Sequence, residues 1–441
     1  MGGAVVQRLK RVWFWLRERR NRLWVTPAVA SVAAVLLALA AAWISRVVPA
    51  GTFPDIERDT LDNLLTVVAS SMLAVTTFSL SIMVAAFASA ASSATPRATE
   101  LVMGDEGTRS AIAVFLSAFI YAVVAQVALG MGYYGSGGRF VLFLGTMLVM
   151  GLLLLTLIQW VKTLTRLGRM SNTLEKIEGA ASEALVNHWR APLLGATPAP
   201  ADDEPAVRRR QPVHAHQVAY VRRIDTDALQ AWADEQGARV HVRVRPGTLV
   251  HPGAELAWVV FDADQPAQAD AAEDEGDPLC PVHDAFYFGP ERSFDQDPRF
   301  GLIVLSETAQ RALSPAVNDP GTAIDVMNRM TRILIESQQA EGASSASDQA
   351  PPCDRVSMVP LDEPGLVFDG FAPIARDGAG TLEVMLRMQK LLSMVAASSR
   401  AASVARAARD MAAQAREAAQ GRLGVQAERD ALDAAHRRLF G

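Results

Sequence analysis

Four long apolar stretches occupy most of the first 161 of the chain's 441 residues, near residues 25–48, 61–92, 109–131 and 139–161. A helix needs roughly 20 residues to cross a bilayer core about 30 Å thick. Each stretch is long enough, and none carries Asp, Glu or Lys in its apolar centre. The sequence therefore predicts a four-helix transmembrane domain over residues 25–161, with the lipid bilayer as a partner.

The distribution of basic residues predicts the orientation of these helices, because Lys and Arg are concentrated in cytoplasmic segments. Residues 1–24 contain seven basic residues, whereas the connection after the first stretch has only Arg58 among several acids. An even number of spans then brings the chain back to the same side. We predict a multi-pass membrane protein with a basic N-terminus and a C-terminus that are both cytoplasmic.

The second stretch is unusual because its polar groups recur at helical spacing. If they face water they are candidates for lining a pore: Asn63, Thr66, Ser70, Thr77 and Ser81. Four helices of one chain rarely enclose a pore, so this interpretation requires a homo-oligomer. Helix packing is the alternative, since hydroxyls can bond carbonyls of their own helix. The absence of intramembrane carboxylates disfavours ion-coupled transport.

Beyond residue 161 the chain is charged, and its patterns predict a cytoplasmic α/β domain. Residues 162–194 continue the last span as an amphipathic connecting helix, and a linker over 195–212 leads to the domain at 213–380. Strands are expected at 216–224, 239–245 and 256–261, with a helix to Gln236 capped by Asp225. The fold class is thus membrane α-helical plus α/β.

Two Pro-Gly turns lie between the last two of these strands, in the segment V-R-P-G-T-L-V-H-P-G-A-E-L-A-W-V. This pattern resembles the hairpins of biotinyl and lipoyl carrier domains and implies a small β-barrel-like unit. Those carriers use a lysine, and this chain has none between residues 177 and 389. The resemblance therefore concerns shape alone.

Candidate chemistry in this half is sparse. Cys280 and His283 could join His214 and His216 in a zinc site, but scattered surface residues are the favoured interpretation, and no metal or cofactor is predicted. Residues 262–277 hold seven acids and are expected to form a solvated loop. Catalytic and nucleotide-binding motifs are missing, so we do not expect an enzyme. The net charge of −5 argues against nucleic-acid binding.

The most specific stretch contains R-A-L-S-P-A-V-N-D-P-G-T-A, over residues 311–323. With the S-A-T-P-R of residues 93–97 and the V-R-P-G turn, it resembles DUF2254, a bacterial family of predicted membrane proteins of unknown function. The resemblance implies a location in the bacterial inner (plasma) membrane. The resemblance covers residues 25–400. It implies four spans plus a cytoplasmic domain, and it transfers no catalytic residue.

This stretch predicts two helices joined by a corner. A helix over residues 300–313 should stop at Ser314 and Pro315, and Asn318 or Asp319 should cap the next one. A rigid structural corner is the favoured interpretation. The alternative is an anion site on the backbone amides of Gly321 and Thr322, although a carboxylate at the cap would oppose it.

The remaining residues predict a helical C-terminal region. Short strands are expected at 356–359 and 366–371, followed by an Ala-rich helix over 381–420 within an Ala/Arg-rich tail at 381–441. That helix is expected to serve packing or oligomerisation.

Two functions follow from these patterns. In the first, the protein is an oligomeric channel for ions, with the second span lining the path and the cytoplasmic domains forming a vestibule. In the alternative, it is a non-conducting membrane scaffold or sensor whose cytoplasmic domain binds a ligand or a partner protein.

Overall fold

The computed structural model describes residues 28–29, 31–33, 35–36, 54, 56–99, 101, 106–166, 169–199, 210–262, 279–340 and 352–441. Two compact units make up the chain, Met1–Thr173 and Leu174–Gly441.

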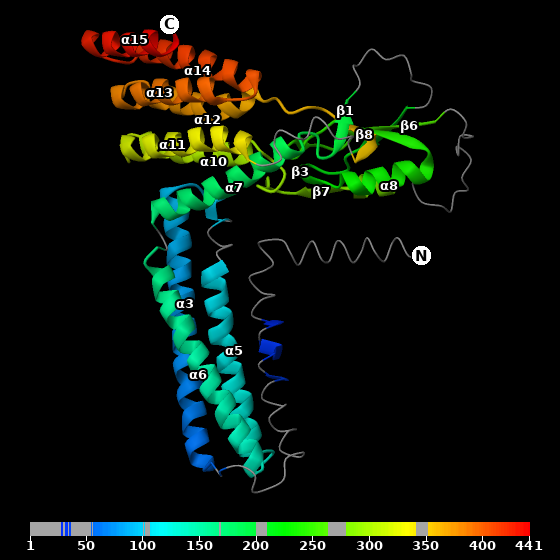
Figure 1. Ribbon diagram of the computed structural model, residues 1–441, viewed down its shortest axis with the longest axis vertical. Coiled ribbons are helices and arrows are strands. Elements are labelled where there is room, and N and C mark those ends of the chain that lie inside the picture. The colour runs from blue at the N-terminus through cyan, green and yellow to red at the C-terminus, as the bar shows by residue number, and fades with distance from the viewer. Residues whose placement is uncertain are drawn as a thin grey trace. The chain divides into compact units, whose positions relative to one another are not determined.

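Three long helices form the described part of the N-terminal unit: α3 (Arg58–Ser93), α5 (Glu106–Gly130) and α6 (Ser136–Leu164) (Figure 1). The 3-10 turn η1 (Pro96–Ala98) follows α3. The helices meet in an apolar core that includes Leu65, Phe115 and Trp160. Large apolar side chains such as Leu148 and Leu154 remain exposed, as expected of a lipid-facing surface.

All three helices are long and apolar enough to cross a membrane, over Arg58–Ser89, Gly107–Gly130 and Ser136–Leu164. They match three of the four predicted spans. The remaining predicted span, at 25–48, lies largely outside the described residues and stays a prediction. The chain is therefore described as a membrane protein with three candidate spanning helices.

The connecting segment differs from the single continuous helix expected over residues 162–194. Helix α6 ends at Leu164, and a separate amphipathic helix, α7, covers Met170–Arg190. Gly168 falls between them in the sequence, and glycine is among the weakest helix formers. Within the C-terminal unit, Glu178 of α7 accepts hydrogen bonds from Arg329 (2.6 Å) and Arg332 (2.7 Å).

The α/β part of the C-terminal unit contains two sheets that share one core. The larger sheet has the order β1 (Ala196–Pro198), β8 (Cys353–Met358), β4 (Ala238–Val242), β6 (Glu255–Phe261), β2 (Arg210–His214). Pairing is parallel from β1 to β4 and antiparallel from β4 to β2. The smaller, antiparallel sheet has the order β5 (Leu249–Val250), β3 (Ala219–Ile224), β7 (Phe286–Gly289).

Helix α8 (Thr226–Gln236) packs on β4 and β8, and α9 (Cys280–Asp284) lies between β6 and β7 in sequence. Alternating valines, among them Val240, Val242 and Val356, are fully buried, which explains why these strands form. The expected strands near 216–224, 239–245 and 256–261 are present. Neither described sheet closes on itself, so the predicted β-barrel-like unit is not confirmed.

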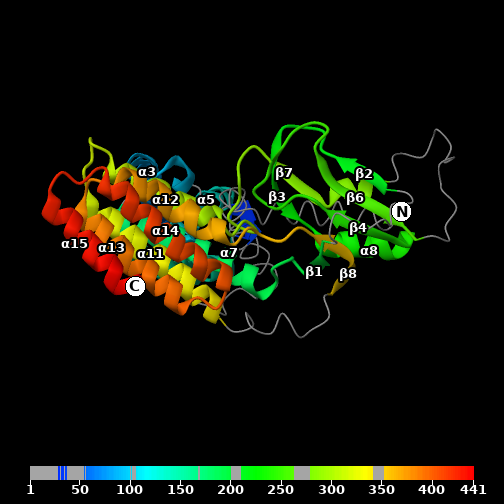
Figure 2. The same cartoon turned by 90° about the horizontal axis from the view of Figure 1, so that it is seen from above.

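The second part of this unit is entirely helical. It contains α10 (Phe300–Leu313), α11 (Pro320–Glu336) with the short η2 (Ser337–Gln339), α12 (Pro364–Asp377), α13 (Leu382–Ser398), α14 (Ala402–Gln420) and α15 (Gln426–Phe440). In this bundle α10 packs on α11 and α12, α12 packs on α14, and α13 packs on α11, α14 and α15 (Figures 1 and 2).

Two expectations for this region were wrong. Residues 366–371 belong to α12 and are not a strand, because Leu366, Val367, Phe371 and Ile374 are buried at helical spacing. The predicted helix over 381–420 is two helices, separated at Ser399. There the buried amide oxygen of Gln338 accepts hydrogen bonds from the Ser399 hydroxyl and the backbone N–H groups of Arg400 and Ala401.

The division of the chain at residue 380 stays a prediction. Helices from both sides of that position contact each other within one bundle, α12 with α14 and α11 with α13.

Candidate functional site

The five predicted pore-lining residues all lie on the exposed side of α3: Asn63, Thr66, Ser70, Thr77 and Ser81. The opposite side of the helix carries Leu61, Leu65 and Val68, which are buried in the core of the N-terminal unit. The structure thus places the five residues along one face, with Thr66 at its border, where the Thr66 hydroxyl contacts α5. Apolar side chains, among them Leu73 and Val84, are exposed beside them.

Hydroxyl groups on this face are bonded within their own helix. Ser70 donates to the Thr66 carbonyl oxygen (2.8 Å), Thr77 to that of Leu73 (2.9 Å) and Ser81 to that of Thr77 (3.0 Å). Such bonds lower the cost of placing a hydroxyl in an apolar environment. They leave lone pairs on the hydroxyl oxygens that can accept from water.

Sequence analysis missed a polar contact between α3 and α5. The amide nitrogen of Gln126 donates to Asp62 (3.2 Å) and to the hydroxyl of Thr66 (3.0 Å). Nearby, Arg58 at the N-terminus of α3 donates to the backbone carbonyl of Gly130 at the C-terminus of α5 (2.9 Å). The amide side chain of Gln126 in the apolar C-terminal half of α5 was the sequence signal that could have indicated this contact.

The second group of predicted site residues forms the corner between α10 and α11. Ser314 ends α10, and its carbonyl accepts from the N–H groups of Val317 and Asn318 (3.0 and 2.8 Å). Asn318 has a φ of 49°, a left-handed conformation that asparagine tolerates better than most residues. Pro315, Asn318 and Asp319 are exposed.

Asp319 caps α11, as one of the two sequence alternatives predicted. Its carboxylate accepts from the backbone N–H (3.0 Å) and the hydroxyl (2.6 Å) of Thr322, and these bonds lower the pKa of Asp319. Pro320 occupies the first helical position. Because a carboxylate already fills the end of this helix, the geometry favours a structural corner over an anion site.

We expect Asp319→Ala to lower the free energy of unfolding by about 1 kcal/mol, the usual cost of a lost helix cap. Asp319→Ser keeps an acceptor at the cap and serves as the control, with a loss of at most a few tenths of that value. Chemical unfolding of the purified protein measures both. Equal stability of the Ala and Ser variants would contradict a capping role.

The V-R-P-G turn and the segment before α10 come together around a buried ion pair. Gly247, with a φ of 92°, lies so close to Asp297 that a Cβ there would stand 2.1 Å from a carboxylate oxygen. Asp297 is 2% exposed and receives two bonds from Arg292, both 2.7 Å long. Arg292 also stacks over Phe300, its guanidinium carbon 5.1 Å from the ring centre. Glycine is therefore required at this turn.

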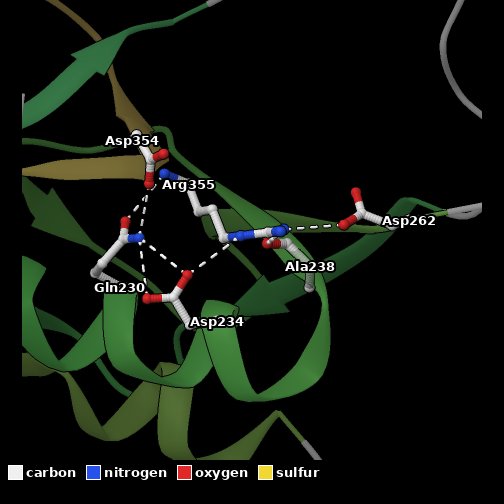
Figure 3. A network of polar contacts seen from close by, with 6 residues as sticks. All are labelled: Gln230, Asp234, Ala238, Asp262, Asp354 and Arg355. Carbon is white, nitrogen blue, oxygen red and sulfur yellow. Dashed lines mark hydrogen bonds and ion pairs between the residues drawn. The ribbon is translucent and has the colours of Figure 1, made fainter. Parts of the chain in front are cut away.

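A second polar network connects α8 to the inner strands β8 and β4 of the larger sheet (Figure 3). Arg355 of β8 bonds the carbonyl of Ala238 (3.2 Å) and the carboxylates of Asp262 (2.9 Å) and Asp234 (3.2 Å). Gln230 of α8 accepts from the Arg355 backbone N–H (3.0 Å). These contacts hold Asp262 where the acidic stretch begins, and the rest of that stretch, 263–277, lies outside the described residues.

The candidate zinc ligands do not assemble into a closed set. His216 stacks on His283 with ring centres 4.5 Å apart, while Cys280 is exposed on α9. Within the described ranges, no three His, Cys, Asp or Glu side chains lie close enough together to hold a metal ion.

A cavity of about 370 Å³ inside the C-terminal unit was not predicted. It is lined by α7, by the connection from β3 to α8, by Arg245 of the V-R-P-G turn and by the loop before α10. Its residues come from four separate segments, so no local sequence pattern marks it.

The predicted membrane protein family DUF2254 matches residues 20–394. The chain belongs to this family. The match includes α3, α5 and α6, the sheets, the corner at Ser314 and most of α13. It agrees with the family resemblance of the sequence, and this DUF2254 protein is thereby described as a membrane protein.

Curated relatives are similar over a limited segment. Uncharacterized proteins of Mycobacterium tuberculosis and Mycobacterium bovis are each 31% identical to this DUF2254 protein over 122 residues, which is 28% of this chain. The segment spans 22% of those relatives' own length. No solved structure matches the chain.

Proposed function

We propose that this protein is an oligomeric ion channel of the bacterial inner membrane, in which α3 of each subunit lines the path. The observation that carries the proposal is the exposed face of α3, where Ser70, Thr77 and Ser81 lie opposite the buried side of the helix and Thr66 lies at the border with α5. A helix face that the described helices α5 and α6 leave largely uncovered is available to a second copy of the chain. Hydroxyl oxygens on it can exchange bonds with water and ions.

The proposed orientation places both termini and the C-terminal unit in the cytoplasm, where that unit forms a vestibule. This rests on the basic residues of segment 1–24 and those that follow α6. The channel acts without catalysis and without nucleic acid as a partner.

Ion flux into proteoliposomes tests the proposal through Ser81. Ser81→Leu removes a hydroxyl and adds apolar bulk, so a narrow path should dewet and the flux should fall at least tenfold. Ser81→Asp should raise cation selectivity, because a hydrated carboxylate on the path attracts cations. Ser71→Leu is the matched control: its hydroxyl is also bonded within the helix, but it lies about 100° around α3 from Ser70 and should leave flux unchanged.

A non-conducting sensor is the second candidate, and the cavity in the C-terminal unit favours it. On a dry contact between helices, Ser81→Asp would cost about 2–3 kcal/mol or more and should dissociate the oligomer. Absence of flux from the wild type under voltage, tension and osmotic shock, together with dissociation of Ser81→Asp on size exclusion, would refute the channel and support the sensor.

A further inference from the structure

The cavity of the C-terminal unit holds a buried polar group that lacks a partner. His188 of α7 lines it and is only 5% exposed. Its Nε2 atom has no hydrogen-bond partner among the described residues. A buried polar atom without a partner is costly, and an unfilled ligand site is one physical reason for a fold to keep one. The imidazole Nε2 is therefore an unused hydrogen-bonding position of a residue that lines the cavity.

His188 and Arg245 both line the cavity, and Arg245 contributes a positive charge to the lining. Burial and the positive charge of Arg245 lower the pKa of His188 to about 4, so its imidazole is neutral near pH 7. The Arg245 guanidinium is held in place by the carbonyl oxygens of Val359 (2.9 Å) and Pro192 (3.1 Å). A fixed cation beside a neutral imidazole suits the oxygen atoms of a carboxylate.

Asp225 and Asp227, at the start of α8, contribute negative charge to the lining. Burial raises the pKa of the nearby Cys353 thiol, and the charges of Asp227 and Asp225 raise that pKa further. Asp225 is occupied as the cap of α8, through the N–H of Ala228 (3.1 Å). Asp227 is exposed and lines the cavity without serving as the cap, so its carboxylate is suited to a cationic group.

The charges of the lining balance. The lining contains three arginines, Arg190, Arg223 and Arg245, and three aspartates, Asp225, Asp227 and Asp295, while His188 is neutral. A ligand with a single charge would be attracted by one set and repelled by the other. A ligand that carries both charges can contact both sets.

We propose that this cavity binds a small zwitterion of the amino-acid class, with its carboxylate toward Arg245 and His188 and its ammonium group toward Asp227. The volume of about 370 Å³ accommodates such a molecule with water beside it. The site is independent of whether α3 conducts ions.

Ligand binding to the full-length protein in detergent tests this proposal. The probes are the twenty standard L-amino acids, with propionate, inorganic phosphate and propylamine as compounds of single charge, measured by thermal shift and isothermal titration calorimetry. We expect at least one amino acid to bind, and the three single-charge probes to bind at least tenfold more weakly, because each makes only one of the two charge-assisted contacts.

Three variants assign the binding to this cavity. Asp227→Asn removes the carboxylate proposed to bind the ammonium group and should weaken amino-acid binding about tenfold or more, whereas Glu235→Gln, on the same helix but outside the cavity lining, should not change it. His188→Phe keeps the ring and removes the unpartnered nitrogen. It should abolish binding without lowering the melting temperature of the ligand-free protein, which separates loss of the site from loss of the fold.

Three results would overturn the proposal. One is the absence of binding by every amino acid at millimolar concentration, and another is equal binding of propionate or phosphate, which would indicate an anion site. The third is unchanged amino-acid binding by both Asp227→Asn and His188→Phe. None of these measurements involves ion flux, so their outcome is separate from the test of the channel.

Discussion

Replacing Asp297 with alanine should lower the free energy of unfolding of the C-terminal unit by about 3–5 kcal/mol, the usual cost of removing one partner of a buried ion pair. Asp297 is 2% exposed, and its carboxylate receives both bonds of Arg292 as well as the backbone N–H of Arg299. Without the Asp297 carboxylate, the guanidinium of Arg292 stays charged beside Phe300 and the turn at Gly247, and no carboxylate neutralises that charge.

Two comparisons separate this effect from a general sensitivity of the loop. Asp295→Ala changes an exposed carboxylate two residues away and should cost about 0.5 kcal/mol or less. The double variant Asp297→Ala with Arg292→Leu should be more stable than the sum of the two single losses predicts, because it leaves no unpaired charge. Chemical unfolding in detergent measures all four. An additive double variant would show that the pair does not act as a unit.

Features encoded in a few neighbouring residues were the ones that the sequence could predict. The spans of α3, α5 and α6 follow from composition and length alone. Asp225 and Asp319 cap their helices as predicted, because a cap depends on an acceptor next to an apolar helical pattern. Both Pro-Gly turns are also local: Gly247 and Gly253 have the positive φ that such turns require.

Features fixed by distant partners could not be predicted. The break between α13 and α14 depends on the side chain of Gln338, more than sixty residues away in sequence. Gly301 gave no signal, yet a Cβ there would lie 2.3 Å from the Cβ of Ala181, so α10 and α7 can pack this closely only because the residue is glycine. The segment 366–371 is too short for its apolar pattern to distinguish a strand from a buried helix.

The candidate sites divide in the same way. Helical spacing alone put Thr66, Ser70, Thr77 and Ser81 on one face, and the structure has them there. His188 stood in an amphipathic helix without a motif around it. Its low pKa depends on burial and on Arg245, 57 residues later in the sequence. The cavity that it lines also needs the loop before α10, and only the folded chain brings these groups together.

The C-terminal unit should lose stability as the pH falls from about 6.5 toward 4, and His188 is the reason for part of that loss. In the folded protein its pKa is lowered from 6.5 to about 4 by burial and by Arg245. Between these values the unfolded chain binds a proton that the folded chain does not, so the free energy of unfolding decreases with falling pH. The contribution of His188 to the free energy of unfolding is fully present above pH 6.5. About 2 kcal/mol of it is lost by pH 5, and about 3 kcal/mol by pH 4.

Carboxylates also titrate in this range, so the prediction concerns the difference between two proteins. His188→Phe should be at least as stable as the wild type at pH 7, and its advantage should grow by about 2 kcal/mol on going to pH 5, because the phenyl ring takes up no proton on unfolding. His251→Phe replaces an exposed histidine of the same unit and controls for the loss of one imidazole. Hydrogen exchange of the amides of α7 in urea, recorded at pH 7 and pH 5, reports the stability around His188. A wild type and a His188→Phe variant that lose stability in parallel would show that the imidazole is protonated in the folded state, contrary to its burial beside Arg245.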